Sequence, residues 1–251
     1  MNSPNKKIFY VGTSGWSYQD WKGKFYPENI KQTDWLDYYS QYFDTVELNA
    51  SFYHQIRAET YANWREQVKS GDFHFSVKIS KYLTHIKKLN NCEEIWNNFI
   101  KNVDHLQDKL GPVLVQIPGN LKANSEKLRS LLQVIPQKYK IAFEPRNETW
   151  LNEKIYKIME EYNCGLVISD TPEWPTEERI TADFVYLRLH GPEGLYDSKY
   201  NDKQLKEWAD KLKDWGKKVK RIYVYFNNDS HGYAVDNALK LKEFLHYEKT
   251  F

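Results

Sequence analysis

The chain has few cysteines, little net charge and no long hydrophobic run, and each scarcity excludes a class of protein. Two cysteines among 251 residues, Cys92 and Cys164, are too few for a disulfide framework or a zinc knuckle. We therefore expect two free thiols in a reducing compartment. No apolar run approaches the roughly 20 residues of a membrane-spanning helix, and residues 1–7 lead into a predicted strand without the core of a cleavable signal. We expect a cytoplasmic protein without a membrane partner.

The net charge is only +2, from 36 Lys and Arg against 34 Asp and Glu. A charge this small does not predict binding to nucleic acid by bulk electrostatics, so any such partner must be argued from local patches. Arginine is also scarce, with seven residues against 29 lysines, which makes the placement of each arginine informative. Aromatic residues, in contrast, are plentiful, with nine Trp and nineteen Tyr, and we assign most of them to packing.

Segments with the composition of strands alternate with helical patterns along the whole chain. The predicted strands are Ile8–Gly12, Asp44–Asn49, Phe73–Ile79, Val113–Ile117, Lys140–Glu144, Gly165–Ser169, Phe184–His190 and Arg221–Asn227. The predicted helices are Asp34–Tyr42, Glu59–Lys69, Glu93–Lys109, Ser125–Val134, Asn152–Tyr162, Gln204–Trp215 and Ala234–Leu245.

This alternation predicts a (β/α)8 TIM barrel, an α/β fold in which helices cover a closed parallel sheet. The connection between strands six and seven, Asp170 to Asp183, contains Pro172 and Pro175 and is too short for a good covering helix. We expect an irregular loop there. Since no linker or low-complexity tract interrupts the pattern, we predict a single domain over residues 1–251.

Several predicted strands carry polar residues on one face, although strands of a parallel barrel are buried on both faces. In Thr45–Asn49, for example, Glu47 and Asn49 alternate with Val46 and Leu48. Polar residues at the carboxyl ends of barrel strands meet at one mouth, where such enzymes place their chemistry. We predict that the strand-end residues converge there: Glu47, Asn49, Lys78, Gln116, Glu144, Arg146, Asp170, Arg188, His190 and Asn227.

Distinctive motifs follow one another along nearly the whole chain. They are Gly12–Tyr18, Phe25–Pro27, Thr45–Tyr53, Phe143–Asn147 with Trp150, Tyr186–Gly191, and Phe226–Asn228 followed by Gly232, Ala234, Asn237 and Ala238. Their order resembles the signature of the DUF72 family, also called YecE-like proteins. The resemblance implies a TIM barrel and supplies no assigned reaction. Such barrels are similar in architecture to a group that includes a metal-dependent DNA-repair endonuclease, whose dense set of ligands this chain lacks.

Two carboxylates are the candidate catalytic residues. Glu47 and Glu144 belong to strands two and five, roughly across the mouth from each other, and could act as general acid and base on either side of a small substrate. The alternative interpretation is ion pairing, because Lys78, Arg146 and Arg188 are near enough in strand order to neutralise them.

The two strand-end arginines suggest an anionic ligand. The guanidinium groups of Arg146 and Arg188 could each bind a carboxylate or a phosphate through two parallel hydrogen bonds. The loop Asn227–Gly232 leads into a helix at a position where barrels often hold a phosphate. The alternative is an Arg–Glu network that fills the lumen. The predicted substrate-binding residues are Asn49, Lys78, Gln116, Arg146, Arg188, His190, Asn227 and Asn228.

The preferred interpretation is an enzyme-like barrel that binds a small phosphate- or carboxylate-bearing ligand, with the reaction open between a hydrolase and a lyase or isomerase. No metal is expected, although Glu47, Glu144, Asp170 and His190 are ligands of the type that Mg²⁺ or Mn²⁺ accepts. One alternative is a metal-assisted phosphodiesterase or nucleic-acid-processing enzyme with a basic strip at Lys81, His85, Lys87 and Lys88. The other is a non-catalytic ligand-binding or scaffold protein.

Overall fold

Eight strands close into a parallel barrel in the computed structural model, which describes residues 8–194 and 196–246. Each strand pairs with the next one along the chain, and β8 pairs with β1 to complete the ring. This arrangement confirms the predicted TIM barrel. Residues 1–7 lie outside the described residues. The strands are β1 (Phe9–Ser14), β2 (Thr45–Leu48), β3 (His74–Lys78), β4 (Leu110–Gln116), β5 (Ile141–Glu144), β6 (Gly165–Asp170), β7 (Phe184–Leu189) and β8 (Arg221–Phe226).

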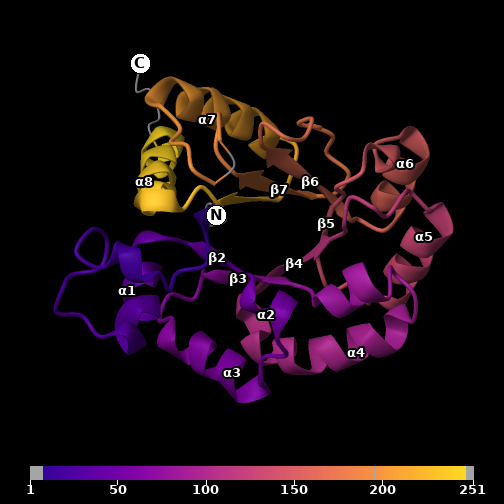
Figure 1. Ribbon diagram of the computed structural model, residues 1–251, viewed down its shortest axis with the longest axis horizontal. Helices are drawn as coiled ribbons and strands as arrows, with labels where there is room; N and C mark the ends of the chain where they lie inside the picture. Colours follow the sequence, from indigo (N-terminus) through magenta and orange to yellow (C-terminus); the bar gives the residue numbers. More distant parts are fainter. Residues whose placement is uncertain (1–7, 195, 247–251) are drawn as a thin grey trace, which may run out of the picture.

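Helices surround the strands, as Figure 1 shows for the series from α3 to α8. They are α1 (Trp35–Tyr42), α2 (Ala50–Tyr53), α3 (Ala58–Gln67), α4 (Cys92–Val103), α5 (Ser125–Val134), α6 (Glu153–Glu161), α7 (Asp202–Gly216) and α8 (Tyr233–His246). Asn124, Asn152 and Asn201 cap α5, α6 and α7 by accepting a backbone N–H bond. No helix within the described ranges is long and apolar enough to cross a membrane.

The connections agree with the prediction at one place and differ at another. Residues 171–183, between β6 and β7, contain no helix, as expected. The predicted helix Glu93–Lys109 is wrong in its second part, because α4 ends at Val103 and a 3₁₀ segment with Gln107 at φ 52° follows. β4 begins at Leu110, directly after this segment, and its pairing with β3 shifts register between Leu110 and Val113.

Strand alternation separates two kinds of interior. Val46 and Leu48 on β2 point outward into the large core between the strands and the helices, whereas Glu47 points into the lumen, where it meets side chains of other strands. A smaller apolar cluster lies inside the barrel and includes Tyr10 and Tyr223. Both cysteines are buried and free, as expected. The sheet therefore carries its polar residues toward its own axis, as the sequence pattern predicted.

Candidate functional site

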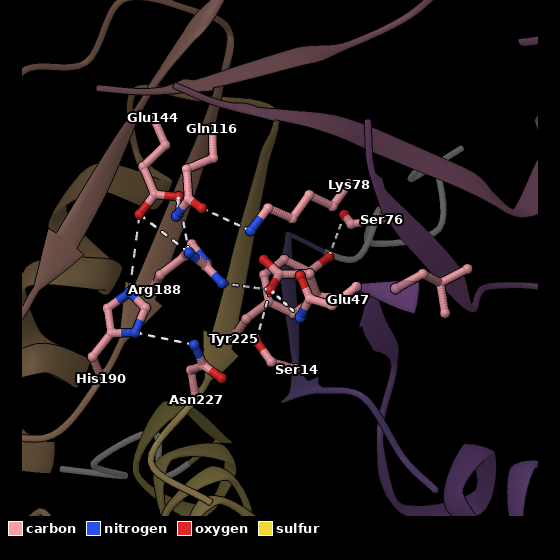
Figure 2. Close-up of polar contacts among 12 residues, drawn as sticks. Ser14, Glu47, Ser76, Lys78, Gln116, Glu144, Arg188, His190, Tyr225 and Asn227 are labelled. Carbon is pink, nitrogen blue, oxygen red and sulfur yellow. Dashed lines mark hydrogen bonds and ion pairs between the residues drawn. The ribbon is translucent and has the colours of Figure 1, made fainter. Parts of the chain in front are cut away.

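Arg188, on β7, is the centre of a charged network at the mouth of the barrel (Figure 2). Its Nη1 donates to Oε1 and Oε2 of Glu144 at 3.1 and 2.8 Å, and its Nη2 donates to Oε1 of Glu47 at 2.8 Å. All three side chains are almost completely buried. One guanidinium group thus binds two carboxylates from β2 and β5, which are distant in the sequence.

Glu47 is bound from several directions. Ser14 Oγ and Asn49 Nδ2 donate to its Oε1 at 2.7 and 3.1 Å, and the Tyr186 hydroxyl donates to its Oε2 at 2.7 Å. Burial alone would raise the pKa of Glu47, but the charge of Arg188 and these donors outweigh burial and hold the pKa below its usual value. Glu47 is therefore a carboxylate at neutral pH, and both of its oxygens accept hydrogen bonds.

Glu144 is held in the same way by a different set of donors. Gln116 Nε2 donates to its Oε2 at 2.7 Å, and Arg146 Nη2 donates to its Oε1 at 2.6 Å. Burial opposes ionisation here too, and Arg188, Arg146 and Lys78 together hold the pKa of Glu144 below its usual value. The sequence suggested that the two carboxylates face each other across a substrate. In the structure the Arg188 guanidinium lies between them and binds both.

Lys78 extends this network from the end of β3. Its Nζ donates to Gln116 Oε1 at 2.7 Å and lies 4.2 Å from the centre of the Phe52 ring. Burial, followed by the repulsion of Arg188, lowers the pKa of Lys78 to about 8. Lys78 therefore remains mostly protonated at neutral pH, yet part of its population is a neutral amine.

His190 is buried beside the Glu144 carboxylate. Its Nδ1 lies 3.1 Å from Asn227 Nδ2, and its Nε2 lies 3.4 Å from Arg146 Nη2 and 3.9 Å from Glu144 Oε1. Burial and the neighbouring arginines lower the pKa of His190 well below its usual value. The imidazole is consequently neutral and adds no charge to the mouth.

A cavity of about 470 Å³ opens above the network. Its lining includes Lys78 and Arg188, together with Asp229 from the loop after β8. Burial raises the pKa of Asp229 to about 6, although Trp21 Nε1 donates to its Oδ1 at 2.8 Å. The other lining residues are Asn49, Tyr53, Gln116, Tyr196, Asn227 and Ser230.

Two strand-end residues do not join the site. Asp170 is the last residue of β6, and its Oδ2 accepts from Tyr200 and Trp208. Asp170 therefore does not join Glu47, Glu144 and His190, the other residues whose ligand type suits Mg²⁺ or Mn²⁺. No group of three or more His, Cys, Asp or Glu in the described residues is arranged to hold a metal ion. Asn228 is the other exception, because its amide bonds to Ser198 and Asn237 instead of the mouth. Strand alternation explains both errors, since Ser169 and Asn227 take the inward positions.

The sequence interpretation missed several residues that shape the site. Ser14 and Tyr186 bind Glu47 directly, and the Tyr225 hydroxyl below them bridges Thr45 and Ser76 at 2.7 and 2.6 Å. Alternation placed Tyr186 and Tyr225 on the polar face but gave no role to their hydroxyls. Asp229 lies within the loop Asn227–Gly232, and only the structure shows its hydrogen bond with Trp21 and its place in the cavity lining.

Comparison with known proteins agrees with the motifs described above. Residues 10–250 match the family described as "Protein of unknown function DUF72". The chain belongs to the DUF72 family. UPF0759 protein YunF from Bacillus subtilis is 28% identical, with 96% of each chain covered. UPF0759 protein YecE from Escherichia coli K12 is 21% identical, covering 83% of this chain and 82% of YecE.

Solved structures place the DUF72 chain in the same fold. A DUF72 family protein from Thermotoga maritima MSB8 has a TM-score of 0.85 and 32% identity, covering 95% of this chain and 99% of the other. A D-psicose 3-epimerase determined in the presence of D-fructose has a TM-score of 0.53 and 10% identity, covering 95% and 97%. At that identity the second likeness shows only a shared barrel architecture.

Proposed function

We propose that this DUF72 barrel binds a small anionic ligand, one that bears a carboxylate or a phosphate, in the cavity at its mouth. The observation that carries the proposal is the set of cationic hydrogen-bond donors at the mouth. Lys78, Arg146 and Arg188 contribute three positive charges, and Glu47 and Glu144 contribute two negative charges. The network alone has an excess of one positive charge, but Asp229 also lines the cavity and, with a pKa of about 6, is mostly ionised at pH 7. The sum over the mouth is thus close to zero, and an anion would be held by the individual cationic donors.

The available hydrogen-bond donors support the same conclusion. Arg146 uses only Nη2 for its contacts with described residues, and its side chain is 23% exposed. Its remaining N–H groups are thus free to bind a ligand, although Arg146 is not one of the residues that line the 470 Å³ cavity. Arg188 Nε and Asn49 Oδ1 are buried and have no hydrogen-bond partner among the described residues. Both residues line the cavity. The Nε–H of Arg188 could donate to an anion, whereas Asn49 Oδ1 is an acceptor and would need a hydroxyl or N–H group of the ligand.

In this proposal the two glutamates hold the arginines, and Asn49, Gln116 and Asn227 orient the ligand. The acid/base role suggested for Glu47 and Glu144 stays a prediction. Their contacts favour the holding role because every carboxylate oxygen already accepts hydrogen bonds from protein groups. A proton-transfer step would have to displace one of these donors.

Calorimetric titration with inorganic phosphate and with oxalate, at constant ionic strength and pH 7, tests the proposal. We expect binding of at least one anion, weakened about tenfold by Lys78→Met or Arg146→Gln, since a hydrogen bond to a charged group contributes roughly 1.5–3 kcal/mol. Arg129→Gln is the matched control, because Arg129 pairs with Glu161 on the outer surface. Equal heats for these anions and for chloride, or equal losses in all three variants, would contradict the proposal.

A further inference from the structure

The described residues contain two buried lysines, Lys78 and Lys109, and each is 8% exposed. Lys109 precedes β4, and its Nζ donates to two backbone carbonyls, Val68 O at 2.6 Å and Ser70 O at 2.5 Å. These acceptors stabilise the charged ammonium form, although burial still lowers the pKa of Lys109. Lys78, in contrast, donates only to Gln116 Oε1 and forms no ion pair with a carboxylate of the described residues. The charged form of Lys78 is therefore less firmly held.

The surroundings of Lys78 are suited to a neutral, reactive amine. The Phe52 ring excludes water from one side of Nζ, although its face also attracts the ammonium form, and the 470 Å³ cavity lies on another side. With a pKa of about 8, roughly a tenth of Lys78 is unprotonated at pH 7. A buried lysine whose amine is neutral near physiological pH can act as a nucleophile toward a carbonyl carbon.

We propose that Nζ of Lys78 condenses with the carbonyl carbon of a small anionic carbonyl compound to form an imine. This inference rests on the proposed function, because the anionic group would be held at the mouth by Arg188 and Asn227, which line the cavity together with Lys78. That group is the carboxylate of a 2-oxo acid or the phosphate of a phosphorylated ketone. The 2-oxo acid and the phosphorylated ketone each carry a reactive carbonyl group near a negative charge.

The condensation balances with groups that are present at the mouth. The lone pair of the amine forms the C–N bond while the π electrons of the carbonyl move to its oxygen, which then takes a proton from the nitrogen. Asp229 lines the same cavity and, when protonated, gives a second proton to this hydroxyl group. Water leaves as the nitrogen lone pair forms the C=N bond, so the products are a protonated imine, water and the Asp229 carboxylate.

Reductive trapping tests the inference. The protein is incubated with pyruvate or with dihydroxyacetone phosphate in the presence of cyanoborohydride, which reduces an imine to a stable secondary amine, and is then digested for peptide mass spectrometry. In one of the two arms we expect the Lys78 peptide to be labelled before those of exposed lysines. In the pyruvate arm its mass increases by that of pyruvic acid less one oxygen atom. Lys109→Met should keep this label, whereas Lys78→Met should lose it.

Oxalate separates this inference from the proposed function, because it is an anion that has no ketone or aldehyde carbonyl and forms no imine. Oxalate that binds and slows the labelling of Lys78 would support both. Binding of oxalate or phosphate without preferential labelling of Lys78 in either arm would overturn only the imine. Absence of both anion binding and labelling would overturn both. Thermal unfolding of Lys78→Met and Lys109→Met confirms that each variant is folded before its label is compared.

Discussion

At the amino-terminal end of the lumen Tyr10 stacks on His74, with ring centroids 4.5 Å apart, whereas four residues later the same strands carry Ser14 and Lys78. Strands β7 and β8 show the same contrast between a lower end of packed rings and an upper end of polar residues. Phe184 and Tyr223 pack at the lower end of β7 and β8, and Arg188 and Asn227 lie on the same faces at the upper end. Alternation puts all of these side chains inside the barrel, but only distance along the strand separates packing residues from residues of the mouth.

The largest expected effect comes from removing the centre of the mouth network. Arg188→Met would leave Glu47 and Glu144 buried without their shared cation, so we expect a loss of about 4 kcal/mol in the free energy of unfolding. Denaturant titration measures it. Arg129→Gln, which breaks an exposed ion pair, should change little. If both variants lose the same small amount of unfolding free energy, the network around Arg188 contributes no more stability than an exposed ion pair.

A somewhat smaller loss of stability is expected at the lower end. Tyr223→Ala would remove a buried ring that stacks on Tyr10 and a hydroxyl 3.0 Å from His74 Nδ1, at a cost of about 3 kcal/mol in unfolding free energy. Anion binding by the folded fraction should stay unchanged, because Tyr223 does not line the mouth cavity. Titration with phosphate below the unfolding temperature checks this. Loss of binding would show that the two ends are energetically coupled.

The next effect concerns a charge that burial disfavours. The pKa of Lys78 is about 8 in the folded protein and 10.5 in the reference state. Between these values the unfolded chain holds a proton that the folded chain has released, so wild-type stability gains from a rise in pH. Below pH 8 the full penalty of about 3 kcal/mol applies. Because Met also loses the hydrogen bond to Gln116, which contributes about 1 kcal/mol, we expect Lys78→Met to be more stable by roughly 2 kcal/mol.

Urea denaturation at several pH values should show this advantage shrinking as the pH rises from 8 toward 10. The same deprotonation removes a positive charge from the mouth, so anion affinity should fall over that range in the wild type but not in Lys78→Met. The Lys109→Met variant provides a matched comparison, because Lys109 is equally buried and lies away from the mouth. An advantage of Lys78→Met that is independent of pH would rule out this explanation.

The smallest effect is expected in the layer between the two ends. Tyr225→Phe deletes a hydroxyl that bonds to both Thr45 and Ser76, and we expect about 1 kcal/mol of lost stability. Thermal unfolding measures the change, and anion titration should show no difference from wild type. A larger effect on anion binding than on stability would show that Tyr225 belongs to the mouth and not to the packed lower part of the barrel.

Much of the upper region could be predicted from local patterns. The alternation of Val46, Glu47 and Leu48 identified an inward carboxylate, and the same reasoning placed Gln116 and Arg188 inside. The predictions were wrong where the position of a residue along its strand was misjudged by one, because a shift of one residue turns the side chain to the opposite face. Asp170 belongs to β6 and faces α7, and Asn228 follows the inward Asn227. The early end of α4 at Val103 was also missed, because the apolar stripe continues through Leu106.

By itself, the sequence determined that eight strands alternate with helices and that their polar faces turn inward, since a period of two residues follows from the geometry of any extended chain. Only the tertiary structure decided that Arg188 binds both glutamates, that Lys78 forms no ion pair with a carboxylate of residues 8–194 or 196–246, and that Asp229 shares its cavity. These contacts join residues from opposite sides of a closed ring. Their partners depend on strand register and side-chain reach, which no local pattern contains.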